Sequence, residues 1–194
     1  MPTQVERRET TRAALLVAAR RLFTEKGFAA TGREEIAELA GVTRGALYHH
    51  FESKQAAFEA VATELDSELA VAVVKAARRA STAHEQIRLS CRAYLHACTD
   101  PSVVRILLTE AAAVLGAQWV RASNEAACVQ LLTPTLELAK RDGHPIPGDT
   151  HLAAQLLVGM LNEAAAIVAM SSNPKAVAKK LAPTVDAWVT KLLS

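Results

Sequence analysis

The sequence is poor in aromatic residues, cysteine and excess charge. Phe, Trp and Tyr make up 4% of its 194 residues, whereas 51% of the residues are hydrophobic, mainly Ala and Leu. Such a composition favours close-packed helices and leaves few β-branched runs that could form strands. A chain of this length and hydrophobic content can bury a core and is not expected to be disordered. We therefore predict an all-α protein.

The three cysteines do not predict a disulfide framework. An odd number spread over a chain of this size favours a reducing compartment. Cys91 and Cys98 are seven residues apart, which on one helix is about 10 Å along the axis and too far for a disulfide. With His84 and His96 they would need ligands from other segments to hold a metal. Metal or redox sensing is therefore a minor alternative to ordinary buried thiols, and no metal site is predicted.

Neither a targeting segment nor an enzyme motif is evident. The opening MPTQVERRETTR is charged and lacks the apolar core of a signal peptide. We find no uncharged apolar stretch near the length that a membrane span needs. The chain also has no Gly-rich phosphate loop, nucleophile elbow or His-Glu metal helix. We therefore expect a soluble cytoplasmic protein without membrane contact, catalysis or cofactor.

The stretch from Gly32 to Phe51, GREEIAELAGVTRGALYHHF, has the pattern of two short helices joined by a turn at residues 40–42. Apolar residues in the first piece recur at helical spacing, and Thr31 with Glu34 forms a capping-box pattern before it. Thr43 is placed to cap the second piece, which has an i, i+4 apolar face. This arrangement predicts a helix-turn-helix, whose second helix enters the major groove of DNA.

A longer helix is predicted upstream, from Arg8 to Lys26, with Gly27 as its C-terminal stop. We expect it to supply the small core that two short helices cannot build alone. Arg7, Arg8 and Arg12 near its start form either an arm that touches DNA phosphates or a solvated charge run. Charge itself does not decide for nucleic acid, because the formal net charge is only +2.

The segment AGVTRGALYHHFESK and the preceding TRAALLVAARRLFTEKGFAATGREEIAELAG resemble the DNA-binding segment of the TetR family of bacterial repressors. The resemblance covers roughly the first third of the chain, and the total length and all-helical remainder suit the family. Where the family usually has Ser or Thr followed by an aliphatic residue, this chain has Gly32 and Arg33. That departure leaves the capping residue open and makes Arg33 a candidate extra DNA contact. The resemblance implies a helix-turn-helix domain at residues 1–54 and a helical ligand-binding and dimerisation domain at residues 55–194.

The second short helix carries most of the residues that we expect at DNA. Arg44 is its only long cation and is the candidate for bidentate guanine readout, and Gly45 lets the backbone come close to the duplex. The phosphate contacts that the resemblance implies fall on Tyr48, His49, His50 and Lys54. Packing of His50 against its neighbour and partial burial of Tyr48 are the alternatives. The predicted DNA-binding residues are Arg33, Thr43, Arg44, Gly45, Tyr48, His49, His50 and Lys54.

Further helices are predicted at residues 53–80, 83–98, 101–115, 118–141 with a bend or break near Pro134, 150–171 and 174–194. The predicted caps of four of them are Ser53, Thr82 in a capping-box pattern with Glu85, Asp149 or Thr150, and Asn173. The first of these helices connects the two regions, and the interior of the others is either core or pocket. The resemblance implies a small-molecule inducer bound there, which the aliphatic interior suggests is lipophilic. Asn162 and Glu163 interrupt an otherwise apolar helix, although a hydrogen bond in a dimer interface explains them equally well. The candidate effector residues are Tyr94, Cys98, Glu110, Trp119, Gln155, Met160, Asn162 and Glu163.

The last two helices are the second strongest pattern. The first of them is apolar nearly all round, and the final one has an apolar stripe at spacings of three and four. A helix that is apolar on every side must be covered on every side. We therefore expect a two-fold homodimer through a four-helix bundle, with complete burial within one monomer as the alternative. The predicted interface residues are Leu152, Leu156, Met160, Ile167, Leu181, Val185, Trp188 and Leu192.

These patterns predict a DNA-binding homodimer, and the resemblance to the TetR family implies a ligand-responsive repressor that binds a palindromic operator and is released by a small molecule. The alternative is a helical small-molecule or protein-binding module that has lost operator binding. The sequence predicts neither the operator nor the identity of the effector.

Overall fold

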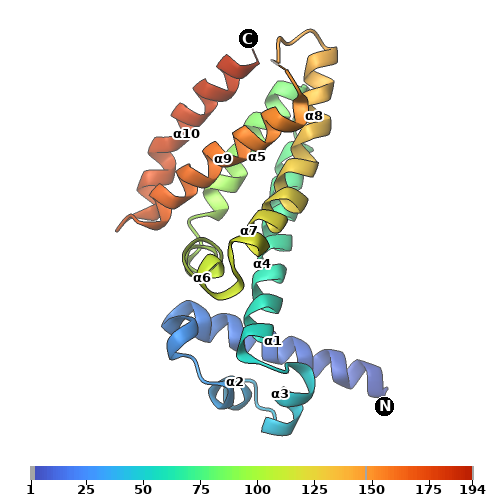
Figure 1. Ribbon diagram of the computed structural model, residues 1–194, viewed down its shortest axis with the longest axis vertical. Helices are drawn as coiled ribbons and strands as arrows, with labels where there is room; N and C mark the ends of the chain where they lie inside the picture. The colour runs from blue at the N-terminus through green and yellow to red at the C-terminus, as the bar shows by residue number, and fades with distance from the viewer. Residues whose placement is uncertain (1–2, 147, 194) are drawn as a thin grey trace.

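The computed structural model describes residues 3–146 and 148–193, and all their regular elements are helices (Figure 1). The all-α prediction is therefore confirmed. Helices α1 to α3 form one end of an elongated molecule, and α4 leads from them to the remaining helices at the other end (Figure 1). The elements are α1 (Gln4–Ala30), α2 (Arg33–Leu39), α3 (Arg44–His50), α4 (Lys54–Ala77), α5 (Ala83–Ala97), η1 (Val103–Glu110), α6 (Ala111–Leu115), α7 (Ala117–Asn124), η2 (Glu125–Val129), α8 (Gln130–Arg141), α9 (Thr150–Ala169) and α10 (Pro174–Leu192).

Helix α1 begins earlier than the sequence pattern predicted, because Thr3 and Glu6 form a capping box. The basic residues near its start are therefore helical, and their interpretation as a separate arm is wrong. The predicted stop at Gly27 is a kink, since Gly27 has φ +81° and the chain makes one further turn before the helix ends. Positive φ is readily adopted only by glycine, so the kink has a local cause.

The core beneath α1 to α3 is aromatic. The rings of Phe23, Phe28 and Phe58 lie with centroids 5.1 to 6.0 Å apart, and Phe23 and Phe58 are fully buried. Leu47 from α3 is also buried in this core. Phe23 and Phe28 belong to α1 and Phe58 belongs to α4, so these directional ring contacts fix α1 against the start of α4.

Helix α4 joins the two ends of the molecule without a flexible linker. Ser53 caps it as predicted, with its hydroxyl accepting from the amide of Ala56 at 2.9 Å. Its 24 residues span about 36 Å, and they run through the predicted domain boundary as one helix. Near its middle, Glu68 accepts both hydrogen bonds from one guanidinium nitrogen of Arg20 on α1, at 2.8 and 2.9 Å. This ion pair joins the middle of α4 to α1.

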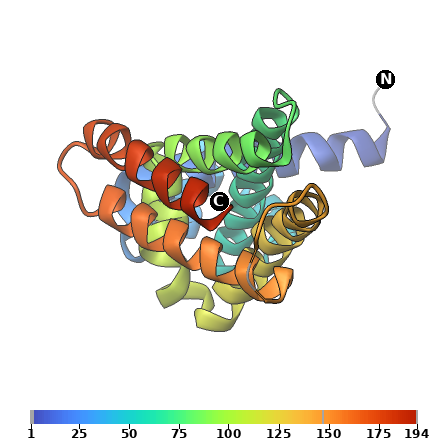
Figure 2. The ribbon, with the colours of Figure 1, turned by 90° about the horizontal axis from the view of Figure 1, so that it is seen from above.

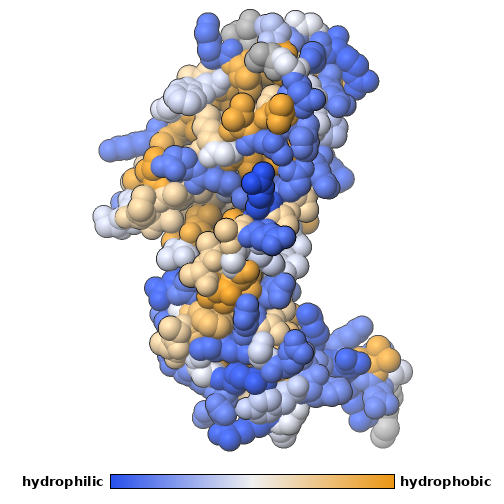
Figure 3. Space-filling model, in the orientation of Figure 1, coloured by the Kyte–Doolittle hydropathy of each residue, from blue (hydrophilic) through white to orange (hydrophobic). Residues whose placement is uncertain are grey.

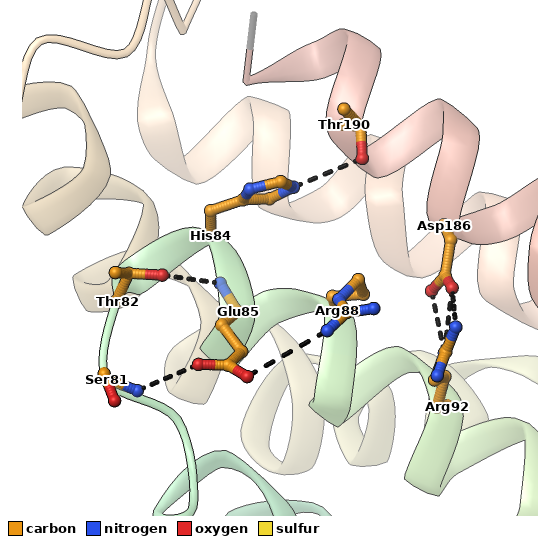
Figure 4. Close-up of polar contacts among 8 residues, drawn as sticks. All are labelled: Ser81, Thr82, His84, Glu85, Arg88, Arg92, Asp186 and Thr190. Atoms are coloured by element: carbon orange, nitrogen blue, oxygen red, sulfur yellow. Dashed lines mark hydrogen bonds and ion pairs between the residues drawn. The ribbon is translucent and has the colours of Figure 1, made fainter.

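The C-terminal helices are held to one another by polar links as well as apolar packing. Helix α10 packs on α5 and α9 (Figure 2). In Figure 4 the guanidinium of Arg92 on α5 faces the carboxylate of Asp186 on α10, to which its Nε donates at 2.8 Å. The first turn of α5 is capped by Thr82, whose hydroxyl accepts from the amide of Glu85 as the sequence predicted (Figure 4).

Two segments depart from regular α-helix. Val103–Glu110 is a π-helix, and Gly116, at φ +91°, separates α6 from α7 as expected. The predicted single helix 118–141 is interrupted by the π-helical turn Glu125–Val129 rather than at Pro134. Pro134 lies shortly after that widened turn, near the start of α8, where the ring is accommodated without ending the helix.

By length and composition alone, helix α9 (Thr150–Ala169) is apolar enough to cross a membrane, and 44% of its most apolar window is buried in the structure. It contains Glu163, so the prediction that no uncharged apolar stretch reaches that length is not contradicted. Its buried residues pack among the C-terminal helices. The apolar character that remains is on its exposed face.

Candidate nucleic-acid interface and effector cavity

The two short helices form the predicted helix-turn-helix. The turn between α2 and α3 passes through Gly41 at φ +67°, where a side chain would be strained. Thr43 caps α3, its hydroxyl accepting from the amide of Ala46 at 3.2 Å. The predicted capping box at Thr31 is wrong, because Gly32 is the N-cap residue of α2 and gives no side-chain bond. The hydroxyl of Thr31 donates instead to the carbonyl of Gly27 at 2.7 Å, which is left free by the kink in α1.

Arg33 holds α3 in place instead of projecting toward solvent. Its Nη2 donates to the carbonyl of Phe51, the C-cap residue of α3, at 2.7 Å, and its guanidinium lies 4.0 Å from the centre of the Tyr48 ring. The start of α2 is thus bonded to the end of α3. The prediction of Arg33 as a DNA contact is corrected, because its guanidinium is engaged within the domain.

Lys54 is likewise engaged within the domain. Its ammonium donates to the carbonyls of Phe28 at 2.7 Å, Thr31 at 2.9 Å and Ala29 at 3.3 Å, and it lies 4.4 Å from the centre of the Phe28 ring. These carbonyls lie at the C-terminal end of α1, where intrahelical amide partners run out, and that of Phe28 also accepts from the amide of Thr31 at 3.4 Å. In this structure Lys54 therefore caps the C-terminus of α1 and has no donor left for a phosphate.

The remaining predicted residues form the exposed face of α3. The side chain of Arg44 is 72% exposed, and its guanidinium lies 4.0 Å from the carboxylate of Glu34. A Cβ added at Gly45 would meet only the Thr43 hydroxyl, at 3.9 Å, so the backbone is open to a close approach. Tyr48 is 49% exposed, and His49 is exposed as well. The surface over α1 to α3 is predominantly hydrophilic (Figure 3).

His50 is half-buried near the end of α3. Burial lowers the pKa of its imidazole, and the positive charge of His49, Arg8 and Arg12 lowers it further. The N-terminal arginines of α1 therefore lie near enough to α3 to act on its last turn. A cationic surface of this kind, with one helix exposed, can approach a phosphate backbone.

The C-terminal helices enclose two adjoining cavities. The larger, of about 280 Å³, is lined mainly by aliphatic residues from α4, α5, α8 and α9. The smaller, of about 200 Å³, includes Asp66, Trp119, Ser123 and Asn162. Tyr94 lines both, and its hydroxyl donates to the amide oxygen of Asn162 at 2.8 Å. This bond forms part of the wall between an apolar compartment and a more polar one.

Three of the predicted effector residues, Tyr94, Trp119 and Asn162, come together at these cavities. The others do not line either of them. Cys98 is fully buried, and Glu163 is exposed.

Gln155 and Met160 lie on other parts of α9. The side-chain nitrogen of Gln155 is 3.4 Å from a carboxylate oxygen of Glu125. Met160 lines a surface groove with Leu152 and Leu156. Sequence periodicity placed both residues on the correct helix but on the wrong side of it.

Asp66, Ser123 and Cys128 line the smaller cavity and were missed by the sequence analysis. The signal for Asp66 was present, because it is spaced by i, i+4 and i, i+3 from the buried residues Ala62 and Leu69 on the apolar side of α4.

Comparison with known proteins agrees with both halves of this description. Residues 15–61 match the family model for bacterial regulatory proteins of the tetR family, and residues 84–192 match that of the tetracyclin repressor-like C-terminal domain. The chain belongs to the TetR family. A TetR-family transcriptional regulator from Pectobacterium atrosepticum has a similar structure, with a TM-score of 0.85 and 33% identity over 99% of this chain and 98% of its own.

Curated TetR-family relatives match only in part. The transcriptional activator FasR from Mycolicibacterium smegmatis is 34% identical over 45% of this chain, and the transcriptional repressor BepR from Brucella suis biovar 1 is 48% identical over 30%. The matched segments span 40% and 28% of the lengths of those relatives. The likeness to them therefore concerns less than half of each protein.

The TetR-type helix-turn-helix is bonded to the C-terminal helices through Glu110. One of its carboxylate oxygens accepts from the amide of Phe28 at 2.7 Å, and the other accepts from the Nε of Arg105 at 2.9 Å. A Cβ added at Gly27 would lie 2.3 Å from Arg105 and 2.5 Å from Glu110. Glu110, predicted as an effector ligand, is therefore a link between η1 and the kink of α1.

The exposed face of α9 and α10 in this TetR-family chain is apolar. Leu156 is 78% exposed, Trp188 63% and Leu152 58%, and Figure 3 shows hydrophobic colour over the C-terminal part of the molecule. Complete burial within one monomer is therefore wrong. Of the predicted interface residues, Val185 is corrected, because it is 4% exposed and packs inside the chain. Ile167 is exposed, and Leu181 and Leu192 are half-buried.

Of the three free thiols, those of Cys91 and Cys98 are buried and that of Cys128 is half-buried. Burial raises the pKa of Cys91 and Cys98 to about 12 and that of Cys128 to about 11. A thiol with so high a pKa is almost wholly protonated at neutral pH and a poor nucleophile. Within residues 3–146 and 148–193, no group of three or more His, Cys, Asp or Glu side chains is arranged to hold a metal ion.

Proposed function

We propose that this TetR-family chain is a cytoplasmic, ligand-responsive transcriptional repressor that binds a palindromic operator as a homodimer. The observation that carries the proposal is the exposed face of α3, where Arg44, Gly45 and Tyr48 project from a rigid aromatic core. Arg44 reads a guanine in the major groove, and Tyr48 and His49 bind phosphates. Thr43, which caps α3, places the start of that helix at the DNA backbone. His50 is half-buried and lies near the bound phosphates.

The exposed apolar face of α9 and α10 supports dimerisation. Leu152, Leu156 and Trp188 are covered when two copies pack by a two-fold axis, which also pairs two α3 helices for two half-sites. A single α3 offers one long cation for base readout, so one protomer alone has too few contacts for specific binding. Pairing is therefore part of DNA recognition.

The contacts that lead from the cavities to α3 support the release of DNA by a small molecule. Helices α4 and η1 line the smaller cavity and also contact α1, through Glu68 and Arg20 on one side and through Glu110 and the amide of Phe28 on the other. A ligand that binds more tightly to the arrangement with mismatched α3 helices shifts the population away from DNA. The ligand is largely apolar, because aliphatic residues dominate the larger compartment.

A gel-shift titration with the DNA upstream of the chain's own gene tests this proposal. We expect a specific complex that survives excess random DNA and weakens steeply with salt. The alternative is a helical binding module without operator recognition. Equal affinity for upstream and random DNA supports that alternative and contradicts the proposal.

Repression is distinguished from activation by a reporter under the upstream promoter. We expect expression to rise when the gene is deleted and to fall again when it is restored. A fall on deletion indicates activation, the role named for the Mycolicibacterium relative. A thermal-shift screen of apolar compounds, repeated with the bound DNA, identifies effectors as compounds that stabilise the free protein and dissociate the complex.

A further inference from the structure

The smaller cavity contains an acidic side chain without a cationic partner. Asp66 projects from α4 into this cavity, and its Oδ2 accepts from the hydroxyl of Ser123 on α7 at 2.5 Å. Among the described residues no Lys, Arg or His lines the cavity, and no salt bridge involves Asp66. Burial raises the pKa of Asp66, and the bond from Ser123 lowers it. A carboxylate held this way is stabilised by any cation that enters.

The other walls of the cavity suit an organic cation rather than a metal ion. The indole of Trp119 lines the same space, and aromatic rings attract ammonium groups through their faces. Asn162 adds an amide, while most of the remaining lining is aliphatic. Metal ions require several anionic or oxygen ligands, and Asp66 is the only acidic residue of this lining.

The neighbouring compartment provides room for the rest of such a molecule. It shares Tyr94 and Cys128 with the smaller cavity and is bounded mainly by aliphatic side chains. A hydrocarbon tail therefore fits beside an ammonium head placed at Asp66. We propose that the effector of this chain is an amphipathic organic cation, with its ammonium group at Asp66 and Trp119 and its apolar part in the larger cavity.

This inference rests on the proposed function for the regulatory meaning of binding, and it adds the chemical class of the ligand. Asp66 lies on α4, the helix that begins at the α1 cap residue Lys54. An ammonium group bound there acts directly on the connecting helix. The carboxylate of Asp66 thus selects a positively charged ligand and is the point at which that ligand acts on α4.

Calorimetric titration with three probes that share one skeleton tests the inference. The probes are 4-phenylbutylammonium, the neutral 4-phenylbutanol and the anionic 4-phenylbutyrate. We expect the ammonium to bind wild type at least tenfold more tightly than the alcohol, a difference of about 1.4 kcal/mol, and the carboxylate to bind most weakly. In Asp66→Asn, which preserves the shape and the acceptor for Ser123, the preference for the ammonium disappears and the affinity for the alcohol changes less than about threefold.

Glu64→Gln is the matched control, because it removes one exposed carboxylate from α4 outside either cavity and should leave all three affinities unchanged. Trp119→Leu should weaken the ammonium more than the alcohol. The inference is overturned by equal binding of ammonium and alcohol, by an unchanged preference in Asp66→Asn, or by failure of all three probes to bind at millimolar concentration.

A parallel gel shift separates this inference from the proposed function. Specific DNA binding without an Asp66-dependent preference for the ammonium contradicts the cation site and leaves the regulator intact. An Asp66-dependent preference without specific DNA binding supports the site and contradicts the regulator.

Discussion

The two ends of this molecule are packed in opposite ways. The helix-turn-helix end contains or contacts all four phenylalanines of the chain, between Phe23 and Phe58, and its helices are joined by the partly buried hydrogen bonds of Arg33 and Lys54. The C-terminal end has an aliphatic interior with two cavities and leaves an apolar face in solvent. The first end buries its aromatic rings, whereas the second keeps Leu152, Leu156 and Trp188 exposed. In the proposed function, the aromatic end recognises DNA and the aliphatic end controls that recognition.

The largest expected effect comes from changing the exposed apolar face. Leu156→Glu introduces a charge at a residue that is 78% exposed in the single chain and buried in the proposed dimer. We expect dimer dissociation to increase more than about 100-fold, since burying an unpaired charge costs several kcal/mol. Sedimentation equilibrium measures the change. Val71→Glu, at an exposed apolar site on α4, should remain dimeric, and an equal effect of both substitutions contradicts the assignment of the interface.

A comparison of two glycine substitutions tests the junction between the two ends of the molecule. Gly27→Ala combines strain at φ +81° with displacement of Arg105 and Glu110, whereas Gly41→Ala, at φ +67°, meets no neighbouring atom within 4 Å. We expect the free energy of unfolding to fall by about 2–4 kcal/mol for Gly27→Ala and by about 1 kcal/mol for Gly41→Ala. Thermal and urea denaturation give both values. Equal losses indicate that the link at Glu110 contributes nothing.

Within the helix-turn-helix, Arg44 and Lys54 should behave differently. Arg44→Ala costs about 1–3 kcal/mol in operator binding and relaxes specificity at one base pair, without loss of stability. Lys54→Ala removes the cap of α1 and should lower the stability of the fold by about 1–2 kcal/mol. Gel shifts against operator variants and thermal melts separate the two effects. Equal losses of Arg44→Ala on specific and random DNA contradict its role in base readout.

Arg33 provides a smaller test of how rigid the DNA-binding end is. Arg33→Lys keeps a charge but loses the planar group that stacks on Tyr48 and the bond to Phe51, so we expect about 1 kcal/mol less stability. Amide exchange at the end of α3 should quicken. Arg21→Lys, at an exposed arginine on α1, is the control and should change neither measurement.

The smallest effect is expected at Asp66 in the absence of ligand. Because its pKa is raised in the folded state, the native protein binds the proton more tightly than the unfolded chain does. Its contribution to stability is therefore favourable at low pH and is lost as the pH rises from the ordinary value of 3.8 through the raised one. Asp66→Asn should raise the melting temperature slightly at pH 7, and this difference should vanish near pH 3. If Asp66→Asn is less stable than the wild type at pH 7, the description of Asp66 as a carboxylate without a cationic partner is contradicted.

The sequence was most informative where structure is local. Thr43, Ser53, Thr82 and Asn173 cap the helices that they were expected to cap, and of the alternatives Asp149 and Thr150 it is Asp149 that caps α9, because a cap depends on residues within one turn. The helix-turn-helix and the apolar face of the last two helices were likewise readable from spacing alone.

Long-range contacts were the source of the errors. Arg33 bonds a residue 18 positions away, Lys54 reaches back 26 positions, and Glu110 reaches back 82. Sequence periodicity does not indicate such pairings. Charged side chains that were predicted to contact DNA or an effector are therefore bonded within the chain. The cavity residues were found in part, since an apolar helix face does not indicate whether its neighbours meet or leave a space.

The central claim is that DNA recognition depends on pairing through the C-terminal end. Sedimentation of the wild-type chain, alone and with the DNA upstream of its gene, tests it most directly. The account predicts a dimer at micromolar concentration and two protomers, or an even number, on each specific duplex. A monomer that binds that duplex one to one, with affinity unchanged by Leu156→Glu, would contradict it.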